Sequence, residues 1–130
     1  MKCLFDTNLP PKLARTLNYL EGDEGIQVIH LNDKFPPYTP DVEWIKKLSR
    51  EEDWFIITRD NQIRKRSHER KAWQESQLPI VFLEKGWINL NLWEIAWRFI
   101  KYWPELKNNI MYNRKVKSLS LAIKGKITVI

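Results

Sequence analysis

The sequence predicts an α/β domain with a central, mostly parallel β-sheet, and three observations support this fold class. The chain of 130 residues is the size of one domain, and its 43% hydrophobic content is enough to build a core. Short apolar runs alternate with amphipathic stretches, as in α/β proteins. The runs are nearly continuous and rich in β-branched or aromatic residues, which is typical of strands buried on both faces.

Four apolar runs are expected to be strands, and four amphipathic stretches are expected to be helices. The first helix opens with prolines suited to a first turn, and the last is expected to close at Pro104. The expected strands are residues 3–5, 28–31, 54–58 and 79–83, and the expected helices are residues 10–20, 41–52, 61–77 and 90–103.

The C-terminal segment predicts a β-hairpin extension. Apolar side chains alternate through residues 116–123, residues 124–126 offer a turn, and residues 127–130 form the expected partner strand. A two-stranded hairpin is marginal alone, so it should dock on the domain or on another chain. We therefore expect a domain over residues 1–112 and a basic hairpin tail over residues 113–130.

Composition argues against a secreted disulfide scaffold and against membrane spans. The single cysteine, Cys3, cannot form an internal disulfide, and it lies in an apolar run where burial is expected. No signal segment of the usual length follows Met1, and no stretch of about 18 apolar residues runs without a charge. We expect a cytoplasmic protein with no membrane partner.

The formal net charge of +6 is unevenly distributed along the chain. Residues 1–58 hold seven basic and ten acidic residues, a net −3, whereas residues 59–71 hold six basic and two acidic residues, a net +4. Residues 113–130 hold five basic residues and no acid. Such asymmetry favours a polyanionic partner such as nucleic acid, although a charge run is more often only a solvated face.

Acidic residues stand where two of the expected strands end. Asp6 follows the first strand and Asp60 follows the third, while Asp41 and Glu43 open the helix that leads toward the third strand. Ligands of a parallel sheet gather outside the carboxyl ends of its strands, so these acids can converge on one rim. Convergent carboxylates raise one another's pKa, and Mg²⁺ or Mn²⁺ relieves this because both ions prefer oxygen ligands. Such a cation can activate water against a phosphodiester.

Structural roles compete with this interpretation for each acid taken alone. Asp41 and Asp60 are good N-caps for the helices that follow, and Glu43 stands i,i+4 from Lys47 as an ordinary surface pair. Asp6 is the exception, because a strand-terminal aspartate has less structural work to do.

The acids lie within three longer segments, FDTNLPPKLARTL (5–17), PDVEWIKKL (40–48) and WFIITRD (54–60). In their order these segments resemble the PIN-like nucleases, in particular the toxins of VapBC-like toxin–antitoxin pairs. The resemblance covers roughly residues 1–104. It implies a three-layer α/β/α sandwich, a Mg²⁺- or Mn²⁺-dependent ribonuclease that cleaves RNA, and neutralisation by a partner antitoxin. The alternative is a catalytically inactive PIN-like module that binds nucleic acid or a protein partner.

The resemblance also implies roles for particular residues. Asp6 matches the first acidic ligand and Asp60 the acid after the third strand. The helix-borne acid is Asp41 or Glu43, and the spacing does not decide between them. A fourth acid, which many PIN domains place near Asp60, is not obvious because position 62 is glutamine.

A basic segment follows Asp60 and predicts contacts with phosphate. Lys and Arg bind phosphates without reading sequence, and they make binding fall steeply with salt. The structural alternative is a solvated helix with charge pairs such as Lys65 with Glu69. The predicted substrate-binding residues of this segment are Arg59, Arg64, Lys65, Arg66 and Arg70, and the resemblance adds Asn8, which matches the asparagine of a D-x-N-L-P pattern in related sequences.

The remaining aromatic and histidine residues are expected to be structural. Trp93, Trp97 and Trp103 recur at helical spacing among apolar residues, which favours a core or homodimer face over stacking on RNA bases. His30 is expected to be a hydrogen-bonded core residue, and His68 a surface residue.

Overall fold

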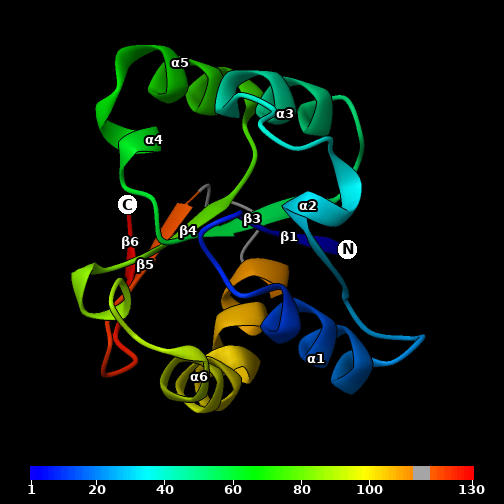
Figure 1. Cartoon of the computed structure of the whole chain (residues 1–130), viewed down its shortest axis with the longest axis vertical. Helices are drawn as coiled ribbons and strands as arrows, with labels where there is room; N and C mark the ends of the chain where they lie inside the picture. The colour runs from blue at the N-terminus through cyan, green and yellow to red at the C-terminus, as the bar shows by residue number, and fades with distance from the viewer. Residues whose placement is uncertain (113–117) are drawn as a thin grey trace.

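A mostly parallel sheet forms the middle layer of the fold (Figure 1). The computed structural model describes residues 1–112 and 118–130. Over these residues the sheet has six strands in the order β2-β1-β3-β4-β5-β6, all neighbouring pairs being parallel except β5–β6. The strands are β1 (Lys2–Phe5), β2 (Gln27–His30), β3 (Trp54–Thr58), β4 (Ile80–Leu83), β5 (Ser118–Leu121) and β6 (Ile127–Val129).

Helices cover both faces of the sheet, which confirms the predicted α/β/α sandwich (Figure 1). One face carries α1 and α6, and the other carries α3, α4 and α5. Two short elements, α2 and the 3₁₀ turn η1, lie in the connections. The bounds are α1 (Pro11–Glu21), α2 (Leu31–Lys34), α3 (Asp41–Ser49), α4 (Gln62–Lys65), α5 (Ser67–Ser76), η1 (Lys85–Trp87) and α6 (Leu92–Tyr112).

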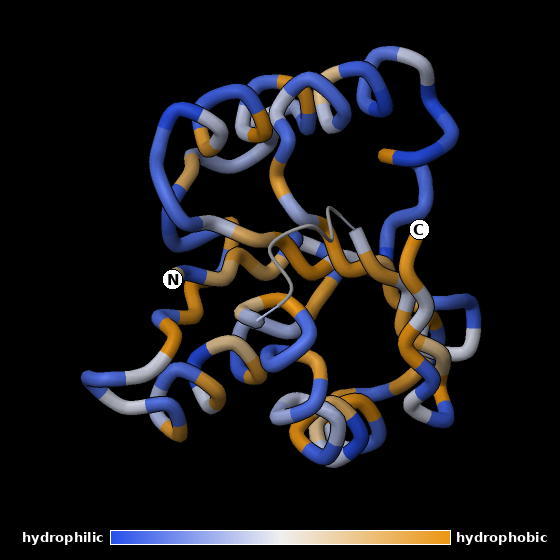
Figure 2. The backbone as a smooth tube through the Cα atoms, turned by 180° about the vertical axis from the view of Figure 1, so that it is seen from behind, coloured by the Kyte–Doolittle hydropathy of each residue, from blue (hydrophilic) through white to orange (hydrophobic). Residues whose placement is uncertain are grey.

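Two apolar clusters form the core, one on each face of the sheet. Phe5 and Ile57 belong to the cluster under α1 and α6, whereas Leu4 and Ile56 belong to the cluster under α3 and α5. Successive strand residues point to opposite faces, so strands buried on both sides need continuous apolar sequence. Figure 2 shows this pattern, with hydrophobic strands in the middle and a largely hydrophilic outer layer at α3 to α5.

The prediction that Pro104 closes the last helix is wrong. α6 continues through Pro104 to Tyr112 and buries Leu106 and Ile110 beyond it. A proline inside a helix removes one hydrogen bond and costs about 3 kcal/mol or more. The apolar contacts that the last turns make with the core offset that cost.

The single helix expected over residues 61–77 is two helices instead. Arg66 has extended backbone with φ −75° and ψ 130°, so α4 ends before it and α5 begins after it. The break turns the chain, and α5 then packs along α3.

The C-terminal hairpin belongs to the central sheet. β5 pairs in parallel with β4, and β6 returns antiparallel to β5, which confirms the predicted hairpin. Of the two expected docking sites, the domain or another chain, the structure shows the domain. Gly125 occupies the turn with φ +95°, a conformation that favours glycine. The predicted boundary after residue 112 falls on residues 113–117, which lie outside the described residues. None of the helices within the described ranges is both long and apolar enough to cross a membrane.

Candidate functional site

The strand order places a topological switch point at the carboxyl ends of β1 and β3. These strands are neighbours, with Phe5 opposite Ile57. The chain leaves β1 for α1 on one face of the sheet and leaves β3 for α4 and α5 on the other face (Figure 1). Ligands bind at such switch points in open α/β sheets. Asp6 directly follows β1, and Asp60 lies two residues beyond the end of β3.

Asp6 is a buried carboxylate held by two hydrogen bonds. Only 4% of the Asp6 residue surface is exposed to solvent. Oδ1 accepts a hydrogen bond of 2.7 Å from the Thr7 amide, and Oδ2 accepts one of 2.7 Å from the Thr58 hydroxyl. The Asp6 amide donates to the Ile57 carbonyl, which continues the pairing of β1 with β3 beyond the strand end. The position and rotation of this carboxylate are therefore fixed by the sheet.

The Thr58 hydroxyl connects Asp6 to the rest of the site. Since its single proton goes to Asp6, its oxygen accepts from the Asp60 amide at 2.9 Å and from Asn8 Nδ2 at 3.4 Å. Asp60 Oδ1 in turn accepts from the Gln62 amide at 2.8 Å, which closes an Asx turn. The N-cap of α4 is Asn61, so Asp60 does not hold the N-cap position expected for it. One hydroxyl thus links the loops after β1 and β3.

The acids influence one another electrostatically. Burial is the main cause that raises the pKa of Asp6 to about 6; the Thr58 hydrogen bond lowers this pKa, and the charges of Asp41 and Asp60 raise it. The pKa of Asp41 is also raised, chiefly by burial and further by the charges of Asp60 and Glu69. Carboxylates from four segments of the chain therefore share one negative field.

Asp41, and not Glu43, is the α3 acid that joins this field. Asp41 is the first residue of α3, and its Oδ1 accepts a hydrogen bond of 2.9 Å from Nε1 of the buried Trp44. Glu43 is exposed and forms the expected surface ion pair with Lys47 at 3.1 Å. The N-cap of α3 is Pro40, so Asp41 does not serve as the side-chain cap that its position suggests.

Glu69 is an acid of the cluster that the sequence does not reveal. Its side chain is only 17% exposed on α5, and its charge contributes to the raised pKa of Asp41. The expected partner Lys65 is replaced by Arg66, which lies 3.7 Å from Glu69. The break at Arg66 explains this change, because Lys65 and Glu69 no longer share one helix.

Arg59 has its guanidinium engaged inside the fold. Nε donates to the Asn8 carbonyl at 2.9 Å, and Nη1 donates to the carbonyls of Trp87 and Ile88 at 3.1 and 3.4 Å. Burial lowers the pKa of Arg59. Arg59 therefore ties the loop after β1 to the loop after β4.

Of the other predicted substrate-binding residues, Asn8 lies in the loop after β1, and Arg64, Lys65, Arg66 and Arg70 lie in α4, in α5 or between these helices. The Arg64 guanidinium stacks over the Phe82 ring at 5.0 Å, and Lys65, Arg66 and Arg70 are exposed. Asn8 is half-buried, and its Oδ1 accepts from the Arg59 amide at 3.1 Å. Within this group, Lys65, Arg66 and Arg70 are the residues whose charged groups a ligand can reach from solvent.

The histidine and tryptophan predictions have mixed outcomes. His30 is buried, donates from Nε2 to the Leu9 carbonyl at 2.8 Å and accepts at Nδ1 from the Asn32 amide, so its core role is confirmed. Trp103 is buried as expected, but Trp93 and Trp97 are 83% and 54% exposed on the outer side of α6. They do not belong to the core of the monomer.

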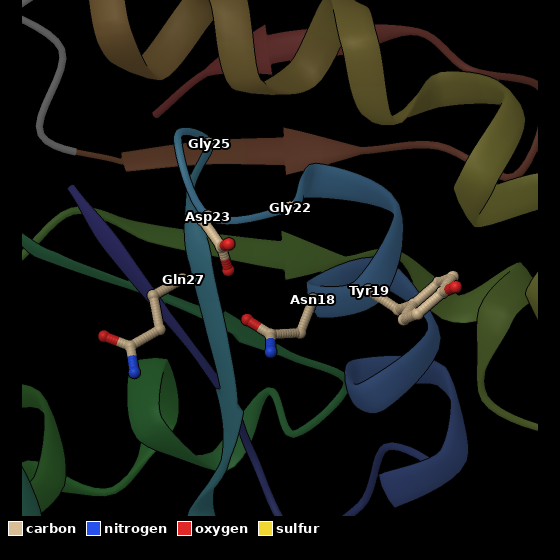
Figure 3. Close-up of a pocket in the computed structure, with 6 residues that line it drawn as sticks. All are labelled: Asn18, Tyr19, Gly22, Asp23, Gly25 and Gln27. Carbon is tan, nitrogen blue, oxygen red and sulfur yellow. The ribbon is translucent and has the colours of Figure 1, made fainter.

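A cavity of about 570 Å³ lies at the other edge of the sheet (Figure 3). Asn18, Tyr19, Asp23 and Gln27 line it, at the end of α1 and the start of β2. The converging acids are at the opposite ends of the strands, so this cavity is separate from the candidate site.

The donor atoms at the candidate site suit a hard divalent cation. Asp6, Asp41 and Asp60 offer carboxylate oxygens, the ligands that Mg²⁺ and Mn²⁺ prefer. The raised pKa values of Asp6 and Asp41 reflect burial and a negative field, and a cation would relieve both effects. Within residues 1–112 and 118–130, however, no three His, Cys, Asp or Glu side chains stand together as a ready metal-binding group.

A family model described as a PIN like domain matches residues 1–85. The chain belongs to the PIN-like domain family. Searches of curated proteins and of solved structures found no match. The PIN-like domain is in general a nuclease fold, and the matched residues include Asp6, Asp41, Asp60 and Glu69. The predicted resemblance to PIN-like proteins is thereby confirmed.

The pKa of Asp6 predicts how stability depends on pH. Folding raises this pKa from 3.8 to about 6, so the folded chain holds the proton more tightly. The resulting stabilisation is complete below about pH 3.8 and is lost as pH rises through about 6. Relative to Asp6→Asn, the wild type should lose on the order of 3 kcal/mol of unfolding free energy across this range. Urea unfolding at a series of pH values, without divalent ions, measures the difference. Asp33→Asn, at an exposed position, is the control; a pH-independent difference for Asp6→Asn would contradict the prediction.

Removal of the Thr58 hydroxyl should raise the pKa of Asp6 above about 6. Thr58→Val loses the donor that stabilises the ionised carboxylate, whereas Thr58→Ser keeps it. Carbon-detected NMR titration of the Asp6 carboxyl measures the pKa in each variant. An unchanged pKa in Thr58→Val would show that the hydrogen bond does not hold the carboxylate.

Proposed function

We propose that this chain is a Mg²⁺- or Mn²⁺-dependent endoribonuclease that hydrolyses RNA phosphodiester bonds. The observation that carries the proposal is the electrostatic coupling of Asp6, Asp41 and Asp60 at the carboxyl edge of the sheet. Membership of the PIN-like family supports it, since this is in general a nuclease fold. Carboxylates with a perturbed pKa at the carboxyl ends of parallel strands are typical of catalytic sites.

In this proposal Asp6, Asp41 and Asp60 hold the cation, with Glu69 next to Asp41. When bound, the cation supplies Lewis-acid stabilisation of the phosphoryl oxygens and a lower pKa for the attacking water. Asp6, buried and raised in pKa, has the most to gain from a positive neighbour.

The chain's own contribution is to orient these carboxylates before substrate arrives. Thr7 and Thr58 hold Asp6, the Gln62 amide holds Asp60, and Trp44 holds Asp41. Preorganised groups need no rearrangement during the reaction, which is a main source of enzymatic rate enhancement.

Positive side chains near the acids provide the affinity for RNA in this proposal. Lys65, Arg66 and Arg70 are exposed and can contact phosphates in this proposal, and Arg66 also pairs with Glu69 of the acidic cluster. Arg59 acts as a positioning residue, because its donors are already bound to backbone carbonyls.

The absence of a ready three-ligand group among the described residues favours a second candidate. In it, the chain keeps the PIN-like fold, binds nucleic acid or a protein partner, and has no catalytic activity. This candidate predicts salt-sensitive RNA binding without cleavage and without stabilisation by divalent ions.

Cleavage assays on variants of the α3 acids test the proposed site. Asp41→Asn should lower Mg²⁺-dependent RNA cleavage by at least about 100-fold. The substitution removes a carboxylate that holds the cation in this proposal, and the cation stabilises the negative charge that develops on the phosphate. Glu43→Gln is the matched control on the same helix and should keep the wild-type rate, because Glu43 lies outside the shared field.

Thermal unfolding gives an independent readout of cation binding. Mg²⁺ at about 100 times its dissociation constant should stabilise the wild type and Glu43→Gln by about 2.7 kcal/mol, but not Asp41→Asn. Activity that persists unchanged in Asp6→Asn would remove the mechanism.

We further propose that the nuclease is the toxin of a VapBC-like toxin–antitoxin pair and acts in the cytoplasm. The resemblance of residues 5–17, 40–48 and 54–60 to such toxins supports this role. The exposed Trp93 and Trp97 on α6 suit burial against an antitoxin or a second copy of the chain.

Toxicity predicts growth arrest when the chain is produced alone in bacterial cells. Asp6→Asn should abolish the arrest, because the effect depends on cleavage. Colony counts and growth curves after induction measure it, with protein levels matched by immunoblot. Equal arrest by the wild type and Asp6→Asn would contradict a toxic nuclease.

A further inference from the structure

A basic groove runs between α3 and α5, beside the candidate site. Two adjoining cavities of about 380 and 210 Å³ lie in it and share Lys46, Ala72 and Glu75 in their lining. The larger cavity is also lined by Val42 and His68. Val42 directly follows Asp41, and His68 directly precedes Glu69, so this end of the groove adjoins the acidic cluster.

The walls of the groove are positively charged. Lys46 comes from α3, Arg50 is the C-cap of that helix, and Lys71 comes from α5. Across the part of the chain that the structure describes, no ion pair joins Lys46 or Arg50 to an acid. Glu75 pairs with Lys71 at 3.9 Å, but both side chains are exposed, so water and salt weaken this pair. The groove therefore keeps an excess of accessible positive charge.

The spacing and floor of the groove suit a single polynucleotide strand. Lys46 lies on α3 and Arg50 is the C-cap of that helix, four residues further on, which corresponds to about 6 Å along the helix axis. Successive phosphates of an extended single strand have a comparable spacing. Ala72 is buried and small, so the floor leaves room for the backbone to approach.

We propose that the α3–α5 groove binds the phosphate backbone of single-stranded RNA on one side of the bond to be cleaved. That the ligand is RNA rests on the proposed function. The route of the strand across the surface rests on the groove itself. The strand leaves the carboxylates at Asp41 and Glu69 and continues past Lys46 and Lys71 toward Arg50. Lys71 belongs to the basic segment of residues 59–71, whereas Lys46 and Arg50 come from α3 and its C-cap, so the path extends beyond that segment.

Salt dependence of RNA binding tests this path without requiring cleavage. Fluorescence anisotropy with a labelled oligouridine is measured over a range of salt concentrations in chelator, so the RNA stays intact. The double variant Lys46→Ala with Lys71→Ala should bind more weakly, and its slope of log affinity against log salt should be smaller by about 1.4. This corresponds to about 0.7 for each lost phosphate contact to a single strand.

Two matched variants separate this effect from a general loss of charge. Lys46→Arg with Lys71→Arg should restore the wild-type slope, because the charges remain. Lys12→Ala with Lys101→Ala removes two exposed lysines from α1 and α6, on the other face of the sheet, and should leave the slope unchanged. Equal slopes for the wild type and the groove variant would overturn the proposal, as would an equal loss in the α1–α6 variant.

A cleavage assay on the same proteins distinguishes failure of this path from failure of the proposed function. RNA cleavage with a normal salt slope in the groove variant means that the nuclease stands and the groove proposal falls. A reduced slope in the groove variant, with no cleavage by the wild type in Mg²⁺ or Mn²⁺, means that the groove stands and the nuclease falls.

Discussion

The hydrogen bond from Thr58 to the buried carboxylate of Asp6 is the constraint on which the site depends. It crosses from the end of β3 to the end of β1, two strands that the sheet already holds in register. Because the hydroxyl gives its proton to Asp6, its oxygen is left to accept from Asp60 and Asn8. The same atom therefore sets the orientation of the buried acid and the course of the loop that carries the next one.

Burial of the Asp6 carboxylate costs solvation free energy, and this cost points to a functional role. A carboxylate removed from water loses solvation, and two hydrogen bonds return only part of it, so the pKa of Asp6 remains well above its usual value. Asp41 shows the same conflict on α3, where its bond to Trp44 does not cancel burial and repulsion. Unfavourable electrostatics of this kind concentrate at functional sites, and favourable interactions elsewhere in the fold compensate for them.

The fold was largely predictable because its strands are buried on both faces. Continuous apolar sequence such as WFIIT has few alternatives to a central parallel strand, and β3 occupies residues 54–58 as expected. Helix ends were harder to predict. At Pro104 local propensity favours a stop, but the burial of Leu106 and Ile110 overrides it, and only the tertiary structure contains that information.

The site was predictable where it depended on strand ends and unpredictable where it depended on helix rotation. Asp6 and Asp60 follow from the positions of β1 and β3. The distinction between Asp41 and Glu43 requires knowing which side of α3 faces the sheet, and spacing alone does not supply it. Glu69 was hidden for a similar reason, because its position depends on the break at Arg66.

The order of elements along the chain also has a consequence for biosynthesis. Every acid of the cluster lies within the first 69 residues, but the face of β1 and β3 that bears Phe5 and Ile57 packs under Phe99 and Leu106 of α6. A ribosome-bound chain that has exposed its acids therefore still lacks the α6 residues that pack on this face of the sheet. During synthesis, which proceeds from the N-terminus, the carboxyl edge gains a rigid support only after the long last helix emerges and docks.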